Sequence, residues 1–154
     1  MIKNLSDFTS KNREPLTGIY IAPDRIAATD SFKLIEQKRE TGAKEPYIAL
    51  LPKGVKTFET AMLQGNNTTV LDDQHIAKVI DGDFPKYESI WPTDKPIATI
   101  KLSAKHLEQV AKAFVGLDPF DGVTIEIRGD KYKPLVFIEE KSGTRAMLMP
   151  MTGN

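Results

Sequence analysis

Apolar residues alternate with polar ones, or form short continuous runs, over much of this chain, and these patterns predict mostly β-strands. Residues 16–22 and 25–37 are two such runs around an Ala-Pro-Asp turn sequence, and they predict a hairpin. Another strand is predicted at residues 47–52, and β-type residues resume through 66–80. Four further strands are predicted at residues 97–102, 122–129, 133–140 and 144–151.

Two segments instead carry apolar residues at helical spacing. Residues 103–114 predict the clearer helix, because Ser103 is a good N-cap at its start. Residues 53–63 predict a second helix in the first half of the chain. The apolar stripes consist of Leu107, Val110, Ala111 and Phe114 in the first case and of Val55, Phe58 and Met62 in the second. Since each helix follows an apolar strand, a weak internal repeat is indicated.

The order of these elements is typical of an α+β fold, with amphipathic helices on one face of a mostly antiparallel sheet. At 154 residues the chain can bury one ordinary core, or one domain and part of another. It has 21 basic and 21 acidic residues, so any attraction to nucleic acid must come from a local patch.

Composition also narrows the chemistry and the compartment. The chain has no cysteine and only two histidines, which excludes disulfides and disfavours a histidine-rich metal site. No apolar run approaches the roughly 20 residues that span a bilayer. We therefore expect a cytoplasmic protein without a membrane partner.

The motifs of common enzyme classes are missing from the sequence. It has no phosphate-binding GxxxxGK loop, no GxSxG elbow and no HExxH motif. One acidic cluster could hold a divalent cation, but its composition is that of solvated turns: Asp72, Asp73, His75, Asp81 and Asp83. A metal-dependent hydrolase is thus the weaker alternative, and we predict a non-enzyme without a metal or cofactor.

Lysines on the predicted helices are better candidates for function. Lys101, Lys105 and Lys112 fall within about 40° of one another on a helical wheel, nearly opposite the apolar stripe. Lys53 and Lys56 project from the other predicted helix. Lysines on helices often simply face water, but two such faces side by side would bind phosphates without reading sequence.

The segment "GDFPKYESIWP", residues 82–92, has the composition of an exit from a structural unit. Pro85 and Pro92 cannot donate to a sheet, and each biases the residue before it toward extended backbone. The apolar side chains of the segment therefore either seal a domain seam or line a groove.

Three motifs in this order carry a resemblance to a family: "AATDSFKL" (27–34), "GDFPKYESIWP" (82–92) and "LMPM" (148–151). They resemble motifs of the bacterial sliding clamp, the beta subunit of DNA polymerase III, with "KGVKTFETAML" standing where that family has a helix rich in Lys, Gly and Val. Ser31 and Phe32 replace the Gly-His that is usual in the family. The chain therefore resembles a short, divergent or partial member.

This resemblance implies a groove for partner peptides, formed by residues from all three motifs. The first strand would contribute Thr29, Phe32, Lys33 and Leu34, the exit segment Pro85 and Ile90, and the last strand Met149, Pro150 and Met151. Residues 1–92 would correspond to the middle domain of a clamp and residues 93–154 to the second half of its final domain, the two together forming either separate units or one compact domain.

The implied function is a processivity or tethering protein for DNA replication or repair. It would hold duplex DNA without sequence specificity and dock a polymerase or other clamp-binding proteins through short peptides. The chain is too short to close a ring alone or as a dimer, so a ring would need several copies joined edge to edge. The candidate edge strands for this homo-oligomer are residues 133–140 and 18–22. The alternative is a monomeric clamp-like module that binds peptides without encircling DNA.

Overall fold

The computed structural model describes residues 4–56, 58, 61–64 and 67–151. The chain forms two compact units, Met1–Trp91 and Pro92–Asn154, called the first and the second unit below. Among the described residues, no helix is long and apolar enough to cross a membrane.

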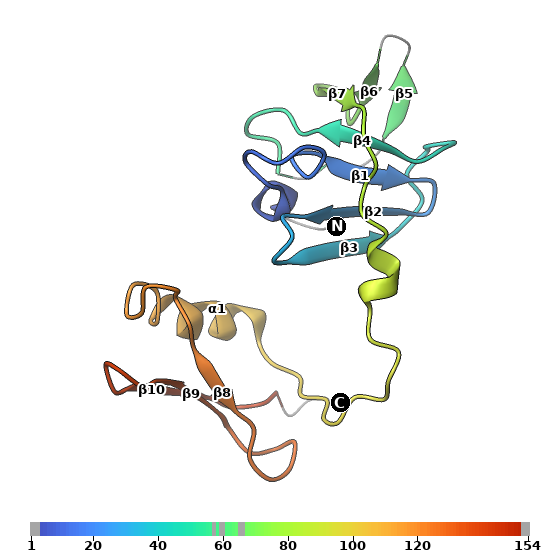
Figure 1. Ribbon diagram of the computed structural model, residues 1–154. Coiled ribbons are helices and arrows are strands. Elements are labelled where there is room, and N and C mark those ends of the chain that lie inside the picture. Colours follow the sequence, from blue (N-terminus) through green and yellow to red (C-terminus); the bar gives the residue numbers. More distant parts are fainter. Residues whose placement is uncertain (1–3, 57, 59–60, 65–66, 152–154) are drawn as a thin grey trace. The chain divides into compact units, whose positions relative to one another are not determined.

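The first unit is built on a seven-stranded antiparallel sheet (Figure 1). Its strands are β1 (Ile19–Ala22), β2 (Arg25–Thr29), β3 (Leu34–Lys38), β4 (Tyr47–Leu50), β5 (Met62–Gln64), β6 (Thr68–Val70) and β7 (Ile76–Ile80). They lie in the order β3-β2-β1-β4-β7-β6-β5, so β3 and β5 are the edge strands.

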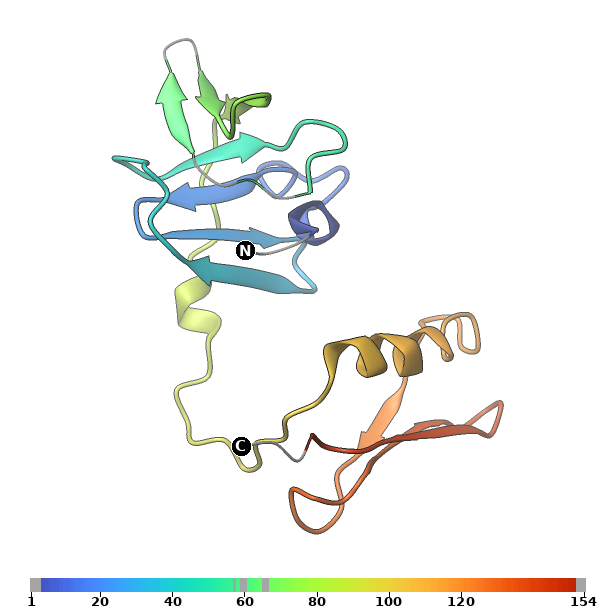
Figure 2. The same ribbon diagram turned by 180° about the vertical axis from the view of Figure 1, so that it is seen from behind.

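The two faces of this sheet are covered by different segments. A 3-10 helix, η1 (Leu5–Phe8), and the connection after β4 pack on one face, where Leu5, Val55 and Phe58 join the buried core. Residues 81–90, which follow β7, cross the other face, as the front and back views of Figures 1 and 2 agree. They end in a second 3-10 helix, η2 (Tyr87–Ile90).

Alternation along β1 explains why both faces can be covered. Ile19 and Ile21 point into the core and are fully buried, whereas Tyr20 between them points to the opposite face. There the Tyr20 ring stacks on Phe84 with 5.1 Å between ring centroids. The sheet is thereby held between η1 on one side and the exit segment on the other.

The second unit consists of one helix and a three-stranded antiparallel sheet. The helix is α1 (Ala104–Lys112), and the strands are β8 (Thr124–Glu126), β9 (Leu135–Glu139) and β10 (Thr144–Leu148), in the order β10-β9-β8. The side chain of Ser103 accepts a hydrogen bond from the His106 amide and so caps α1, as predicted. Phe114 packs on Phe137 and Leu148 in the core of this unit.

The predicted α+β class with mostly antiparallel sheet is confirmed. The helix predicted at residues 53–63 is wrong, because none of the described residues in this segment is helical. Thr57, Glu59 and Thr60 lie outside the described residues. Gly54 has a φ of 89°, and the Val55 amide donates to the Pro52 carbonyl at 3.0 Å, so a turn stands at the predicted helix start. The last residues of the segment form β5, which pairs with β6.

Three strand predictions also need correction. The predicted strand 25–37 is interrupted by a turn and forms β2 and β3. Residues 97–102 are not a regular strand, although the Met151 amide donates to the Lys101 carbonyl at 2.8 Å. The two strands expected to be free edges are β9 and β1, and both are paired on each side.

Candidate partner-binding pocket

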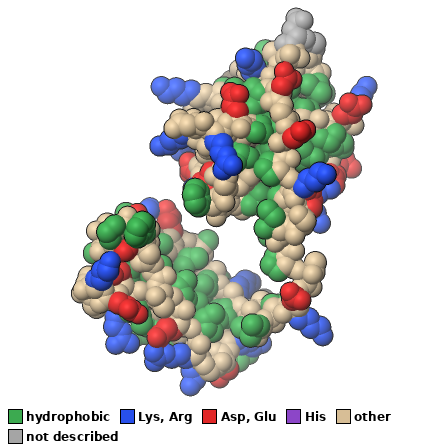
Figure 3. All heavy atoms as spheres, in the orientation of Figure 1, with side chains coloured by type: hydrophobic (Ala, Val, Ile, Leu, Met, Phe, Trp, Pro, Cys, Tyr) green, Lys and Arg blue, Asp and Glu red, His purple; other side chains and the backbone are tan. Residues whose placement is uncertain are grey.

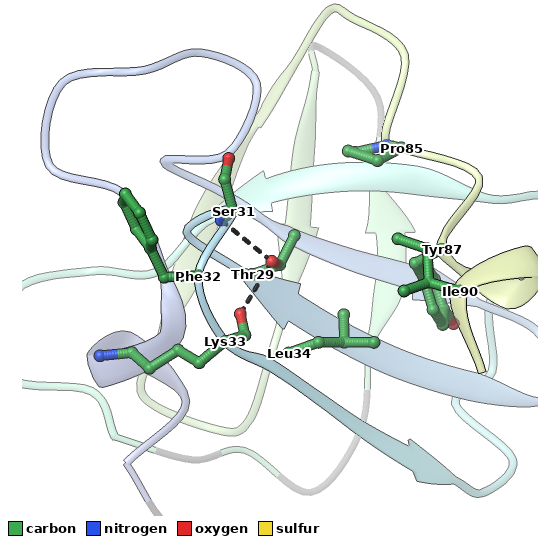
Figure 4. Close-up of a pocket in the computed structure, with 8 residues that line it drawn as sticks. All are labelled: Thr29, Ser31, Phe32, Lys33, Leu34, Pro85, Tyr87 and Ile90. Atoms are coloured by element: carbon green, nitrogen blue, oxygen red, sulfur yellow. Dashed lines mark hydrogen bonds between the residues drawn. The ribbon is translucent and has the colours of Figure 1, made fainter. Parts of the chain in front are cut away.

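A pocket of about 300 Å³ lies in the first unit, where the β2–β3 turn approaches the exit segment (Figure 4). It is lined by Thr29, Ser31, Phe32, Lys33 and Leu34 from the turn and by Pro85, Tyr87 and Ile90 from the exit segment. Two segments that lie more than fifty residues apart in the sequence therefore form its walls.

The turn that forms one wall is held by side chains of its own sequence. Asp30 Oδ1 accepts hydrogen bonds from the amides of Phe32 and Lys33, at 2.9 and 3.0 Å. These amides, that of Phe32 above all, lower the pKa of the Asp30 carboxyl below its usual value. Thr29 Oγ1 donates to the Lys33 carbonyl at 2.8 Å and accepts from the Ser31 amide. Asp and Thr at these positions thus end β2 and start β3.

Ser31 stands at the strained position of the turn. Its φ is 84°, in the left-handed region that glycine enters without steric cost and other residues enter at a cost. Glycine is the residue that the sliding-clamp motif places here, so the local backbone fits that motif even though the side chain differs. Arg13 Nη1 donates to Ser31 Oγ at 3.1 Å.

The opposite wall is fixed by Tyr87, which is 1% exposed. Its ring packs edge-on against Tyr20 and Phe84, with ring centroids 6.2 and 5.9 Å apart. Its hydroxyl donates to Glu36 Oε2 at 2.7 Å. Burial, together with the Glu36 carboxylate, raises the pKa of the Tyr87 hydroxyl well above its usual value. The exit segment is thereby tied to β3 as well as β1.

The guanidinium of Arg25 links the Glu36 carboxylate to η2. Arg25 Nη1 lies 3.7 Å from Glu36 Oε2 and 3.6 Å from Glu88 Oε1. The Glu36 side chain is mostly buried and the Glu88 side chain is half exposed, so solvent screens the Arg25–Glu36 contact less than the Arg25–Glu88 contact. The contacts of Tyr87 and Arg25 hold the η2 end of the pocket wall in place without using the side chain of Ile90.

The space between the walls is open and apolar. Leu34 is half-buried, Pro85 is exposed, and Ile90 is 71% exposed. Figure 4 shows Leu34 on the side of Tyr87 and Ile90, while Phe32 and Lys33 point away from them at the other end. Phe32 is 97% exposed and packs on little of its own chain. Such a surface can take apolar side chains of a short peptide.

Six of the nine residues assigned to the groove from the sequence thus line one pocket, and sequence reasoning missed two others. Ser31 and Tyr87 line it as well, and both belong to the motifs that carried the prediction. Met149, Pro150 and Met151 are part of the second unit, where Pro150 is buried and both methionines are about half exposed. Their place in the groove stays a prediction.

The lysines assigned to DNA binding are all exposed, but they differ in setting. Lys101 precedes α1 and Lys105 lies on it, whereas Lys112 Nζ contacts Glu108 Oε1 at 2.7 Å. This i,i+4 ion pair is surface-exposed and lowers the pKa of Glu108. Lys53 and Lys56 lie on the irregular connection after β4, not on a helix.

Among the residues considered as metal ligands, Asp72 holds the bend before β7. Asp72 Oδ1 accepts from the amides of Gln74 and His75 and lies 2.8 Å from His75 Nδ1. The Gln74 amide is the main reason that the pKa of Asp72 is lowered. Within the described ranges, histidine and acidic side chains do not gather in groups of three or more that could hold a metal ion.

The fold of the chain is α+β and clamp-like. Among solved structures, it is similar to a DNA polymerase III beta chain from Streptococcus pneumoniae TIGR4, with a TM-score of 0.66 and 19% sequence identity. The match covers 96% of this chain and 45% of that chain, so this chain spans less than half of its length. No family model matches the sequence, and no curated protein matches it. At this identity the likeness shows the fold alone.

Proposed function

We propose that the chain is a non-catalytic, clamp-like tether, which associates with duplex DNA without reading sequence and docks replication or repair proteins through a short peptide. The observation that carries this proposal is the pocket between residues 29–34 and 85–90. Both segments belong to the motifs that resemble a sliding clamp, and the chain has a clamp-like fold.

The pocket is suited to apolar anchors of a peptide. Leu34, Pro85 and Ile90 give it an apolar lining, and Ile90 is exposed. The exit segment is held by the Tyr87–Glu36 hydrogen bond, which leaves the Ile90 side chain free. Each anchor that it buries contributes about 1.5 to 3 kcal/mol before ordering costs, so micromolar affinity for a peptide with two or three anchors follows.

The proposed attraction to DNA comes from lysines and is local. Lys101 and Lys105 are exposed near the start of α1, and the chain as a whole is neutral. A protein that surrounds DNA needs only a modest attraction to phosphates, because its release is prevented by topology. Encirclement would require several copies of the chain.

A monomeric peptide-binding module is the second candidate, and one observation favours it. Lys112 is paired with Glu108, and Lys53 and Lys56 do not lie on a helix, so the predicted basic face is reduced. Retention on DNA beads at high salt separates the two functions. A ring should stay on closed circular DNA and leave after linearisation, whereas equal loss from both forms would favour the module.

A further inference from the structure

The loop that joins α1 to β8, residues 113–123, presents apolar side chains to solvent. Phe120 is 91% exposed, and Val115 and Leu117 are exposed as well. Figure 3 shows hydrophobic side chains at the surface of this end of the second unit. Single apolar residues on a surface are ordinary, but three within six positions of one loop form a cluster. Because an aromatic ring has a large apolar surface, Phe120 is a candidate anchor for a docking contact.

The α1–β8 loop is held by its own carboxylates. The Gly116 amide donates to Asp121 Oδ1 at 2.7 Å, and the Phe120 amide donates to Asp118 Oδ2 at 3.2 Å. Lys141 Nζ lies 3.8 Å from Asp118 Oδ1 and offsets part of that charge. None of these contacts uses the ring of Phe120. The loop is therefore acidic and ordered before it binds, which reduces the entropy that docking costs.

The pocket of the first unit suits such an anchor in size and polarity. Its volume of about 300 Å³ is at the lower end of the range of ligand pockets, so it accepts one or two side chains and not a long segment. Leu34, Pro85 and Ile90 form its apolar lining. Phe120 can enter this lining, with Leu117 three positions before it as a second apolar contact.

The charges beside the pocket are complementary to those of the loop. Asp118 and Asp121 stand on either side of Phe120, whereas Arg13 contacts the pocket-lining turn and Lys86 begins η2. Both cations are exposed. The carboxylates nearest to the pocket contact cations of their own unit, in the pairs Asp30–Lys33, Glu36–Arg25 and Glu88–Arg25. An acidic loop is therefore attracted to this part of the surface.

We propose that the α1–β8 loop of one copy of this chain docks in the pocket of a second copy, with Phe120 between Leu34 and Ile90. Each copy offers one loop and one pocket, so the contact is head-to-tail and further copies can add. No sheet edge takes part in it. A docked loop excludes a partner peptide, so self-docking regulates the pocket; this role in regulation rests on the proposed function.

Two variants that each lose one half of the contact test the proposal. Phe120→Ala removes the anchor and keeps the pocket, whereas Ile90→Asp places a charge in the pocket and keeps the loop. Both positions are exposed, so both variants should fold. Each variant alone should associate at least about tenfold more weakly than wild type. Their mixture should form 1:1 dimers and nothing larger, because it contains one intact loop and one intact pocket.

Sedimentation equilibrium of the full chain is the measurement, with circular dichroism as a check of folding. Since a contact with one or two anchors is weak, the concentration series extends to about 1 mM protein. Met147→Ala is the matched control, because Met147 is exposed in the second unit but lies outside the loop. A wild-type mass that stays monomeric would overturn the proposal. Single variants that associate like wild type, or a mixture without dimers, would also overturn it.

A charge reversal tests the complementarity of the two surfaces. Lys86→Glu places a carboxylate beside the pocket, so it should weaken association several-fold. Lys44→Glu changes the net charge equally at an exposed position that does not line the pocket, and it should have little effect. Equal association constants of the two variants would contradict the proposed choice of a loop with two carboxylates as the occupant.

A peptide competition separates failure of this inference from failure of the proposed function. An excess of a Gln-x-x-Leu-Phe peptide should dissociate wild-type assemblies into monomers, because loop and peptide share the pocket. Assemblies that persist while the peptide is bound would refute docking in the pocket and leave the tethering function intact. If neither wild type nor Phe120→Ala binds the peptide while wild type still associates, the tethering function fails and the loop contact stands.

Discussion

Shortening Ile90 to alanine should weaken peptide binding without destabilising the fold. The side chain of Ile90 is 71% exposed, so it contributes little to the free energy of folding. The backbone of η2 is held instead by the buried Tyr87, whose hydroxyl donates to Glu36. Ile90→Ala therefore removes pocket surface and leaves the pocket wall in place.

The size of the effect follows from the exposed fraction. Burying a whole isoleucine side chain contributes about 1.5–3 kcal/mol, so covering the 71% that is exposed contributes about 1–2 kcal/mol. Most of this is lost with alanine, and Kd should rise about 5- to 30-fold. Leu34→Asp, which sets a charge inside the pocket, should abolish binding.

The assay is fluorescence titration of a labelled peptide of the Gln-x-x-Leu-Phe type, which is the type of peptide that the family resemblance implies. Met62→Ala is the matched control, because Met62 is 58% exposed in the same unit and does not line the pocket. Phe32→Ala should preserve or tighten binding, since the ring points away from the apolar end of the pocket. Equal affinities of wild type, Ile90→Ala and Met62→Ala would refute this account of the pocket.

Three further predictions concern charge, strain and pH. Replacing Lys101, Lys105 and Lys112 together by Glu should weaken duplex DNA binding in filter assays and reduce its log–log salt slope by up to about 3. The second unit should stay folded, with a small loss of stability from the broken Lys112–Glu108 pair. An unchanged slope would exclude α1 from DNA binding. Ser31→Gly should maintain or raise Tm, because φ is 84° at this position and glycine adopts such a φ without strain. Ser31→Val should lower the free energy of unfolding in urea by about 1 kcal/mol or more. Equal stability of the two variants would contradict the strain argument. The Ser142 side chain, followed by the amides of Ser142 and Lys141, lowers the pKa of Glu139. The stabilisation by this carboxylate is therefore complete above the unfolded pKa of about 4.3 and is lost as pH falls through the folded pKa. Glu139→Gln should be less stable than wild type at pH 7 and approach it in acid, and a constant difference would be evidence against this linkage.

Sequence patterns predicted best where local chemistry determines structure. α1 was found from its N-cap and apolar spacing, and the hairpin of β1 and β2 from its turn sequence. The helix predicted at residues 53–63 was wrong, because Val55 and Phe58 have helical spacing but are buried in the core from an irregular segment. Gly54 was the available signal against a helix start.

The pocket could be predicted only through the family resemblance. Periodicity does not bring Leu34 next to Ile90, since this requires the exit segment to cross the sheet. The aromatic contact of Tyr20 with Phe84 and the Tyr87–Glu36 hydrogen bond make that crossing possible. Both are long-range contacts with no signature in local spacing. The turn at Ser31 was also missed, although Thr-Asp-Ser is a composition that favours turns.

The most direct test of the proposed tether is whether the protein bridges DNA and a partner peptide. Duplex DNA on beads should retain a fluorescent Gln-x-x-Leu-Phe peptide only when the protein is present, and Leu34→Asp should abolish peptide retention while the protein itself stays on the beads. If wild-type protein binds DNA yet retains no more peptide than Leu34→Asp, or binds peptide only when it is off DNA, the tethering function is contradicted.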